Sequence, residues 1–201
     1  MKIRVFFYLI GLFFMGLGVT FTIKANLGAG AWDALNVGLS KVIGLTVGSW
    51  VFVIGVILMF INAFITKGKP KFLAIITILL IGFFVDFWML VVFKNMFLDG
   101  MVKQVVSLLL GIFFIALGVS MYLQTKFPAN PIDQLMISLH ERFSLNFMVA
   151  KTIGEVVALI LAFIFQGPIG IGTIIITFLI GPIIQMFSKP VSARYDLLLK
   201  R

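Results

Sequence analysis

Long uncharged apolar segments dominate the pattern of the chain. A helix that crosses the hydrocarbon core of a bilayer needs about 20 consecutive, mostly apolar residues. Six segments approach this length, and charged residues interrupt only two of them, at Asp86 and at Lys151 with Glu155. We therefore predict six transmembrane helices: Val5–Ile23, Val47–Ile65, Phe72–Phe93, Val105–Leu123, Phe147–Phe165 and Ile169–Phe187.

Two shorter apolar segments, Ala31–Ile43 and Pro131–Phe143, lie between these runs. Each has about 13 residues, or roughly 20 Å as a helix, which is too short to cross a bilayer. Asn130 stands where a helix N-cap is expected, immediately before Pro131. The pattern predicts two short helices that are either interfacial or re-entrant.

The composition agrees with a membrane protein. The chain has 201 residues, of which 62% are apolar and 11% are charged, and the mean hydropathy is +1.20. A soluble domain is about 45–50% apolar and about 25% charged. So few charges could not cover the surface of a soluble particle, and we expect an all-α integral membrane protein.

Basic residues outnumber acidic residues, at 16 Lys and Arg against 7 Asp and Glu. They lie mostly between the apolar runs, as expected for loops that face the cytoplasm, and not in a pattern that favours nucleic acid. Six crossings with both termini in the cytoplasm put most of these cations on the cytoplasmic side. Eight crossings would fit the charge distribution almost as well, so helix length decides the prediction of six.

The chain contains an internal repeat. Gly11–Thr20 and Gly111–Ser120 are identical at six of ten positions, and Asp33 matches Asp133 at the same offset. We predict one membrane domain built from two repeats, residues 1–100 and 101–201, each with three crossings and one short helix. Because three is odd, the second repeat enters the membrane from the opposite side, which is an inverted repeat typical of many secondary transporters.

Several motifs resemble those of the YczE/YitT group of bacterial membrane proteins, more closely the YczE branch. They lie in both halves and include Glu155: Gly28-Ala-Gly-Ala-Trp-Asp33, Leu45-Thr-Val-Gly48, Pro131-Ile-Asp133-Gln-Leu-Met136, Gly167-Pro-Ile-Gly-Ile-Gly-Thr173 and Gly181-Pro182. The resemblance covers most of the chain. It implies a multi-pass protein of the bacterial cytoplasmic membrane, and it implies no particular activity.

Four acidic residues lie in or near the predicted membrane segments: Asp33, Asp86, Asp133 and Glu155. A charge in the bilayer is costly and usually faces a cavity or a partner. Asp33 and Asp133 could instead cap the first turns of the short helices. Glu155 could form an internal ion pair with Lys151 four residues earlier, and Asp86 could lie near the outer headgroups.

From these residues we predict a solute site. Asp33 and Asp133 are the central candidates for substrate binding, and Asn130 and Gln134 stand beside Asp133. Trp32 could form an aromatic wall for a solute or an anchor at the membrane surface.

A second set of residues is predicted to supply intramembrane or coupling charge. This set comprises Glu155, Lys151 and Asp86.

Enzymatic chemistry is not expected. The chain has no Cys and a single His, so it offers no thiolate ligands, no paired-His metal motif and no evident catalytic triad. The glycine-rich segment 167–173 lacks the lysine of a phosphate-binding loop. We predict no catalytic residues, no metal site and no cofactor.

Two functional hypotheses remain. The first is a transporter or permease for a small polar or amphipathic solute. The second is a non-transporting accessory or scaffold protein, with a membrane protein partner or a second copy of the chain. Its contact or lipid surface would be the basic segment Lys67–Lys71 and the basic end Lys189–Arg201.

Overall fold

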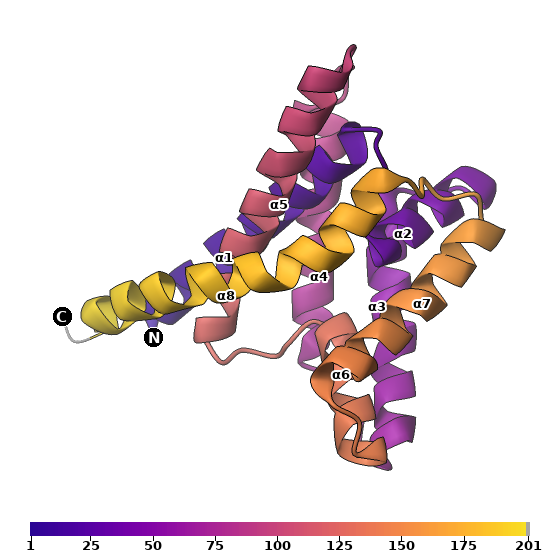
Figure 1. The fold of residues 1–201 in the computed structure, drawn as a ribbon. Helices are drawn as coiled ribbons and strands as arrows, with labels where there is room; N and C mark the ends of the chain where they lie inside the picture. Colours follow the sequence, from indigo (N-terminus) through magenta and orange to yellow (C-terminus); the bar gives the residue numbers. More distant parts are fainter. Residues whose placement is uncertain (200–201) are drawn as a thin grey trace. The chain divides into compact units, whose positions relative to one another are not determined.

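The computed structural model describes residues 1–199, and this part of the chain is helical and contains no β-strand (Figure 1). Eight α-helices and one π-helix follow one another along the sequence: α1 (Lys2–Lys24), α2 (Ala31–Val42), α3 (Val47–Thr66), α4 (Ala74–Asp86), η1 (Phe87–Val92), α5 (Met101–Gln124), α6 (Pro131–Phe143), α7 (Phe147–Ile164) and α8 (Ile171–Leu199).

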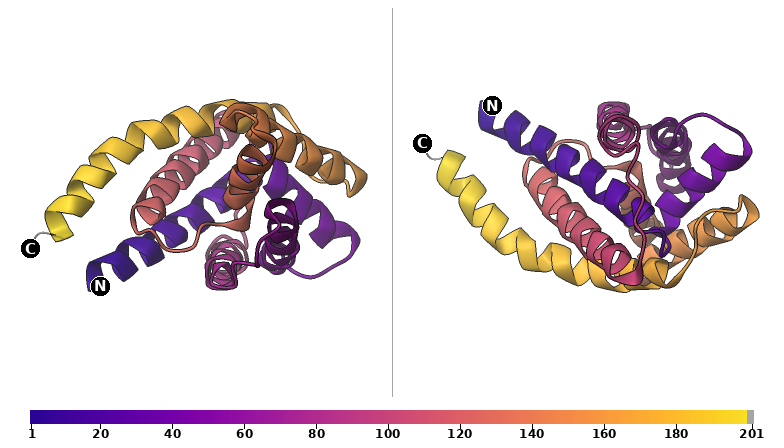
Figure 2. Two further views of the ribbon diagram at one scale, coloured as in Figure 1. Left: turned by 90° about the horizontal axis from the view of Figure 1, so that it is seen from below. Right: turned by 90° about the horizontal axis from the view of Figure 1, so that it is seen from above.

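The prediction of six transmembrane helices is confirmed. Within residues 1–199, six helical segments are long and apolar enough to cross a membrane, and each coincides with a predicted run. The largest difference is at α8, which continues from the predicted end near Phe187 to Leu199. It contains Pro182 and Pro190 and follows a curved path (Figure 2), as expected when proline removes hydrogen bonds from a helix.

The two short helices are also confirmed, since α2 has 12 residues and α6 has 13. Asn130 is the N-cap of α6, and its Oδ1 accepts a hydrogen bond from the Ile132 backbone N–H at 3.3 Å. Pro131 occupies the first turn, as the sequence predicts. Neither helix has the length to cross a bilayer.

The chain divides into two compact units, and each unit contains segments from both halves of the sequence. The first unit comprises Met1–Gly30, Phe84–Phe127 and the chain from Pro168 onward. The second comprises Ala31–Phe83 and Pro128–Gly167. The first unit therefore holds α1, η1, α5 and α8, and the second holds α2, α3, α6, α7 and most of α4.

In the first unit, α1 and α5 cross at glycines. A Cβ on Gly18 would lie 2.6 Å from the Gly111 carbonyl oxygen, and a Cβ on Gly11 would lie 2.8 Å from that of Gly118. Because the early glycine of α1 faces the late glycine of α5, the two helices are antiparallel. Such close approach of two backbones is the usual role of small residues between membrane helices.

Polar side chains connect further helices of this unit. Ser120 of α5 donates to the Ile184 carbonyl oxygen of α8 at 3.1 Å. Trp88 of η1 donates through Nε1 to the Phe13 carbonyl oxygen of α1 at 3.2 Å. These bonds satisfy donors that would otherwise lack a partner in an apolar surrounding.

In the second unit, α2 packs against α3 and α7, and α6 packs against the same two helices. A Cβ on Gly38 of α2 would lie 2.6 Å from the Phe165 carbonyl oxygen, just after α7. Asn62 of α3 donates through Nδ2 to the Pro131 carbonyl oxygen of α6 at 2.9 Å. Both short helices are thus held between α3 and α7.

Candidate functional site

The second unit gathers four of the predicted charged residues. Asp33 is in the first turn of α2, and Asp133 is in the first turn of α6. Both helices pack against α7, which carries Lys151 and Glu155. Glu155 interacts electrostatically with Asp33. Asp133 and Lys151 in turn interact electrostatically with Glu155. We call these four residues the charged cluster.

The environment of Asp33 favours its neutral form. Desolvation by the surrounding protein is the larger cause, and the nearby carboxylate of Glu155 is the smaller one, and together they raise the pKa of Asp33 from 3.8 to about 7. An aspartate with this pKa can bind or release a proton near neutral pH.

Trp32 lies in the interior beside the charged cluster. Its side chain is 9% exposed, whereas an aromatic anchor at the membrane surface would face the headgroups. A Cβ on Gly154 would lie 3.9 Å from Trp32 Cζ2 and 3.6 Å from Leu135 Cδ2. Trp32 therefore packs against α7 at Gly154, the residue next to Glu155.

Asn36 is a further polar residue of this region that the sequence analysis did not identify. It is 2% exposed, and its Oδ1 has no hydrogen-bond partner among residues 1–199. It follows Asp33 by three residues, so the two side chains share one face of α2. The signal in the sequence was an Asn three residues after an Asp, in a largely apolar segment.

Asn130 and Gln134 have other surroundings. Asn130 is buried and caps α6. Gln134 accepts a hydrogen bond at 2.8 Å from Nζ of Lys71, in the α3–α4 loop, and lines a cavity between that loop, α3 and α6. The prediction grouped both residues with Asp133. In the structure, Asn130 caps α6, and Gln134 lines a cavity of its own.

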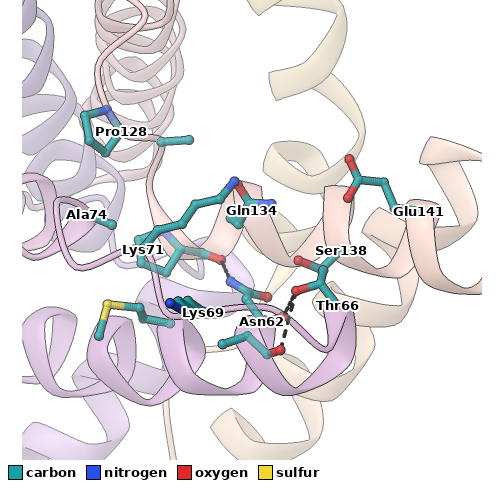
Figure 3. Close-up of a pocket in the computed structure, with 13 residues that line it drawn as sticks. Asn62, Thr66, Lys69, Lys71, Ala74, Pro128, Gln134, Ser138 and Glu141 are labelled. Atoms are coloured by element: carbon teal, nitrogen blue, oxygen red, sulfur yellow. Dashed lines mark hydrogen bonds between the residues drawn. The ribbon is translucent and has the colours of Figure 1, made fainter.

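That cavity has a volume of about 140 Å³, and we call it the α3–α6 cavity (Figure 3). Its polar lining side chains come from α3, the α3–α4 loop and α6: Asn62, Thr66, Lys69, Lys71, Gln134, Ser138 and Glu141. Only Gln134 of this set was predicted as a site residue. The others lie in apolar or basic segments whose sequence gives no sign of a cavity.

Asp86 belongs to the first unit, whereas the charged cluster belongs to the second. It stands where α4 changes into η1. Single π-helical turns are rare and often occur at functional positions. Of the residues predicted to carry intramembrane or coupling charge, Asp86 alone lies outside the unit that contains the charged cluster.

These features define a multi-pass helical membrane protein in which three helices of one unit carry half-buried acidic residues. The chain belongs to a family of unknown function, DUF6198, whose model matches residues 2–189. Among its relatives is the uncharacterised membrane protein YczE of Bacillus subtilis, 34% identical over 190 residues, which cover 92% of this chain and 85% of YczE. The resemblance to the YczE group is therefore confirmed.

Two other relatives cover a similar share of the chain. The uncharacterised protein YyaS of Bacillus subtilis is 40% identical over 191 residues, which are 95% of this chain and 94% of YyaS. An uncharacterised protein of Haemophilus influenzae is 25% identical over 184 residues, which are 89% of this chain and 80% of that protein. No solved structure matches the chain significantly.

Proposed function

We propose that the protein is a transporter or permease for a small polar or amphipathic solute. Asp33, Asp133 and Trp32 bind the solute, and Glu155 with Lys151 supplies the coupling charge. The observation that carries the proposal is the convergence of three carboxylates and one ammonium from α2, α6 and α7 within one unit. The proposal assigns the protein no catalytic reaction.

The free-energy cost of placing charged residues in a membrane supports a functional role for the charged cluster. A charged residue within a bilayer costs at least about 2.5 kcal/mol, and such residues usually mark pathways for ions or solutes. Here Asp33 and Asp133 also lie in the first turns of two short helices, whose N-termini carry partial positive charge. Broken helices with paired N-termini near the membrane centre are the usual site of secondary transporters.

The pattern of contacts supports an inverted repeat as the frame of this site. The α1–α5 contact pairs Gly11 with Gly118 and Gly18 with Gly111. Exchanging each residue with its partner 100 positions away converts one pair into the other, as a two-fold axis between the halves requires. The second unit has the same property, since α2 packs on α7 as α6 packs on α3.

The proposal places the protein in the cytoplasmic membrane of a bacterium, with both termini in the cytoplasm. The α3–α4 loop, which carries Lys67, Lys69 and Lys71, then also faces the cytoplasm, in agreement with the positive-inside rule.

The test is solute-evoked current in proteoliposomes on a solid-supported membrane, with a panel of amino acids, amines, sugars and organic acids. We expect the wild-type protein to give a current with one solute class. Asp33→Asn and Asp133→Asn should each reduce it at least tenfold, because each removes a carboxyl group from the binding site. Asp99→Asn, at an exposed loop position, is the matched control and should leave the current unchanged.

Equal reconstitution of each variant is checked by gel quantification and by size-exclusion elution. A current that survives in both Asp33→Asn and Asp133→Asn would contradict the site assignment.

The second candidate function, a membrane accessory protein, is favoured by one observation. The segment from Phe64 to Leu73 is largely exposed and combines three lysines with apolar side chains, a combination suited to anionic lipid or to a protein partner. On this alternative, replacing Lys67, Lys69 and Lys71 by Gln would impair function more than Asp33→Asn.

A further inference from the structure

The internal sequence repeat pairs the loop that borders the α3–α6 cavity with the α7–α8 loop. At that second loop the corresponding space is closed. The α7–α8 loop aligns with the α3–α4 loop at an offset of 99, and the aligned residues Gln166 and Lys67 share a left-handed backbone conformation. Gly167 lies against the Ala34 carbonyl oxygen of α2, so tightly that no side chain would fit. The aligned Gly68 has no such neighbour, since a Cβ there would meet Thr66 Oγ1 at 3.3 Å. The opening is therefore particular to the α3–α6 side.

Two buried polar atoms at this cavity lack partners. Asn62 is 5% exposed and Ser138 is fully buried. Asn62 Oδ1 and Ser138 Oγ have no hydrogen-bond partner in the part of the chain that the structure describes. A buried polar atom without a partner lowers the stability of the fold, so both atoms favour a bound hydrogen-bonding group. Asn62 Nδ2 already donates to the Pro131 carbonyl oxygen. The atom of this amide without a partner is therefore the acceptor Oδ1, which can accept a hydrogen bond from a ligand.

Cations line the same cavity. Lys69 and Lys71 come from the α3–α4 loop, and Lys71 Nζ bonds to Gln134 Oε1 at 2.8 Å (Figure 3). That bond leaves the Gln134 amide hydrogens and two ammonium hydrogens of Lys71 available. Glu141 of α6 is on the lining as well. The cavity thus offers cationic donors from the loop, and acceptors from Asn62 and Glu141.

We propose that the α3–α6 cavity binds a small group in which an anion, a carboxylate or a phosphate, lies next to a hydrogen-bond donor such as an ammonium or a hydroxyl. The anion contacts Lys69 and Lys71. The donor bonds to Asn62 Oδ1 and Ser138 Oγ. The site is distinct from the charged cluster and holds whether or not the protein transports a solute.

The size of the cavity limits the ligand. A volume of about 140 Å³ is comparable to the roughly 150 Å³ cavity that accommodates benzene. A group of about six to eight non-hydrogen atoms fits this space. L-Serine and phosphoethanolamine are of this size and carry the required pair of groups. The same chemistry is found in a free solute and in the headgroup of phosphatidylethanolamine.

The test is the melting temperature of the purified full-length protein in dodecyl maltoside with L-serine or phosphoethanolamine. We expect at least one probe to raise it by about 5 °C at a concentration near 100 times its Kd. Betaine and phosphocholine keep the anions but have no N–H donor, and they should not raise it. Lys71→Ala and Ser138→Ala should abolish the shift. Lys67→Ala, in the same loop but outside the cavity lining, should retain it.

The source of the group is distinguished in nanodiscs. If free probes have no effect, but phosphatidylethanolamine stabilises the protein relative to phosphatidylcholine and Lys71→Ala removes the difference, the group is a lipid headgroup. If neither source stabilises the wild type, or if Lys67→Ala loses the shift as completely as Lys71→Ala, the proposed site is wrong. Normal elution of Lys71→Ala and Ser138→Ala in size-exclusion chromatography confirms that they fold.

Discussion

Replacing Gly18 by alanine is expected to lower the melting temperature of the protein in detergent by about 2–12 °C. The new Cβ would lie 2.5 Å from the Ile115 backbone nitrogen and 2.6 Å from the Gly111 carbonyl oxygen. Both are backbone atoms, so relief requires α1 and α5 to separate. Overpacking of this kind costs about 1–3 kcal/mol, and each kcal/mol corresponds to about 2–4 °C in a chain of this size.

Gly154→Ala in α7 is the matched control. A Cβ there makes only ordinary contacts, at 3.6 Å and 3.9 Å, and alanine is the better helix former by up to about 1 kcal/mol. We therefore expect no loss of stability. Because Gly118 occupies the equivalent place on α5, Gly118→Ala should be as harmful as Gly18→Ala. If Gly18→Ala is as stable as Gly154→Ala, the close crossing of α1 and α5 is wrong.

Asp33→Asn is expected to remove a dependence of stability on pH. The pKa of Asp33 is raised from 3.8 to about 7, so the folded state holds a proton that the unfolded state has already released. Between these values the unfolded state binds fewer protons, and stability falls as pH rises. Once the pH is above 7, the total loss of unfolding free energy from this group is at most about 4 kcal/mol. The asparagine side chain stays neutral, so the variant should melt several degrees above the wild type at pH 8 and close to it at pH 4.5.

The measurement is thermal unfolding in detergent from pH 4.5 to pH 8. Asp99→Asn is the control, because Asp99 is exposed and its replacement should leave the wild-type slope. A wild-type melting temperature that rises between pH 5 and pH 7, or an Asp33→Asn variant with an unchanged slope, would show that Asp33 is ionised in the folded protein.

The helices were predictable because membrane segments must satisfy their backbone bonds internally and be apolar over a fixed length. The end of α8 was not, because Lys189 and Arg194 end the apolar run while the helix continues to Leu199. Nothing in the segment Phe87–Val92 signals its π-helical hydrogen bonding, which depends on local packing.

The candidate site was predictable in part. Charges in apolar segments are rare enough to identify Asp33, Asp133, Lys151 and Glu155 from the sequence, and the structure gathers all four in one unit. The α3–α6 cavity was not predictable. It depends on how closely a loop approaches a helix, and polar residues such as Ser138 are equally common where their hydrogen bonds are satisfied.

The central claim, that the two halves enter the membrane from opposite sides and bring α2 and α6 to one site, is tested most directly by topology. The chain has no cysteine, so Lys41→Cys in the last turn of α2 and Arg142→Cys in the last turn of α6 can be labelled singly. Both positions are exposed. An impermeant maleimide should label Lys41→Cys only in intact cells and Arg142→Cys only in inverted vesicles. Labelling of both from the same side would contradict the inverted repeat and the site built on it.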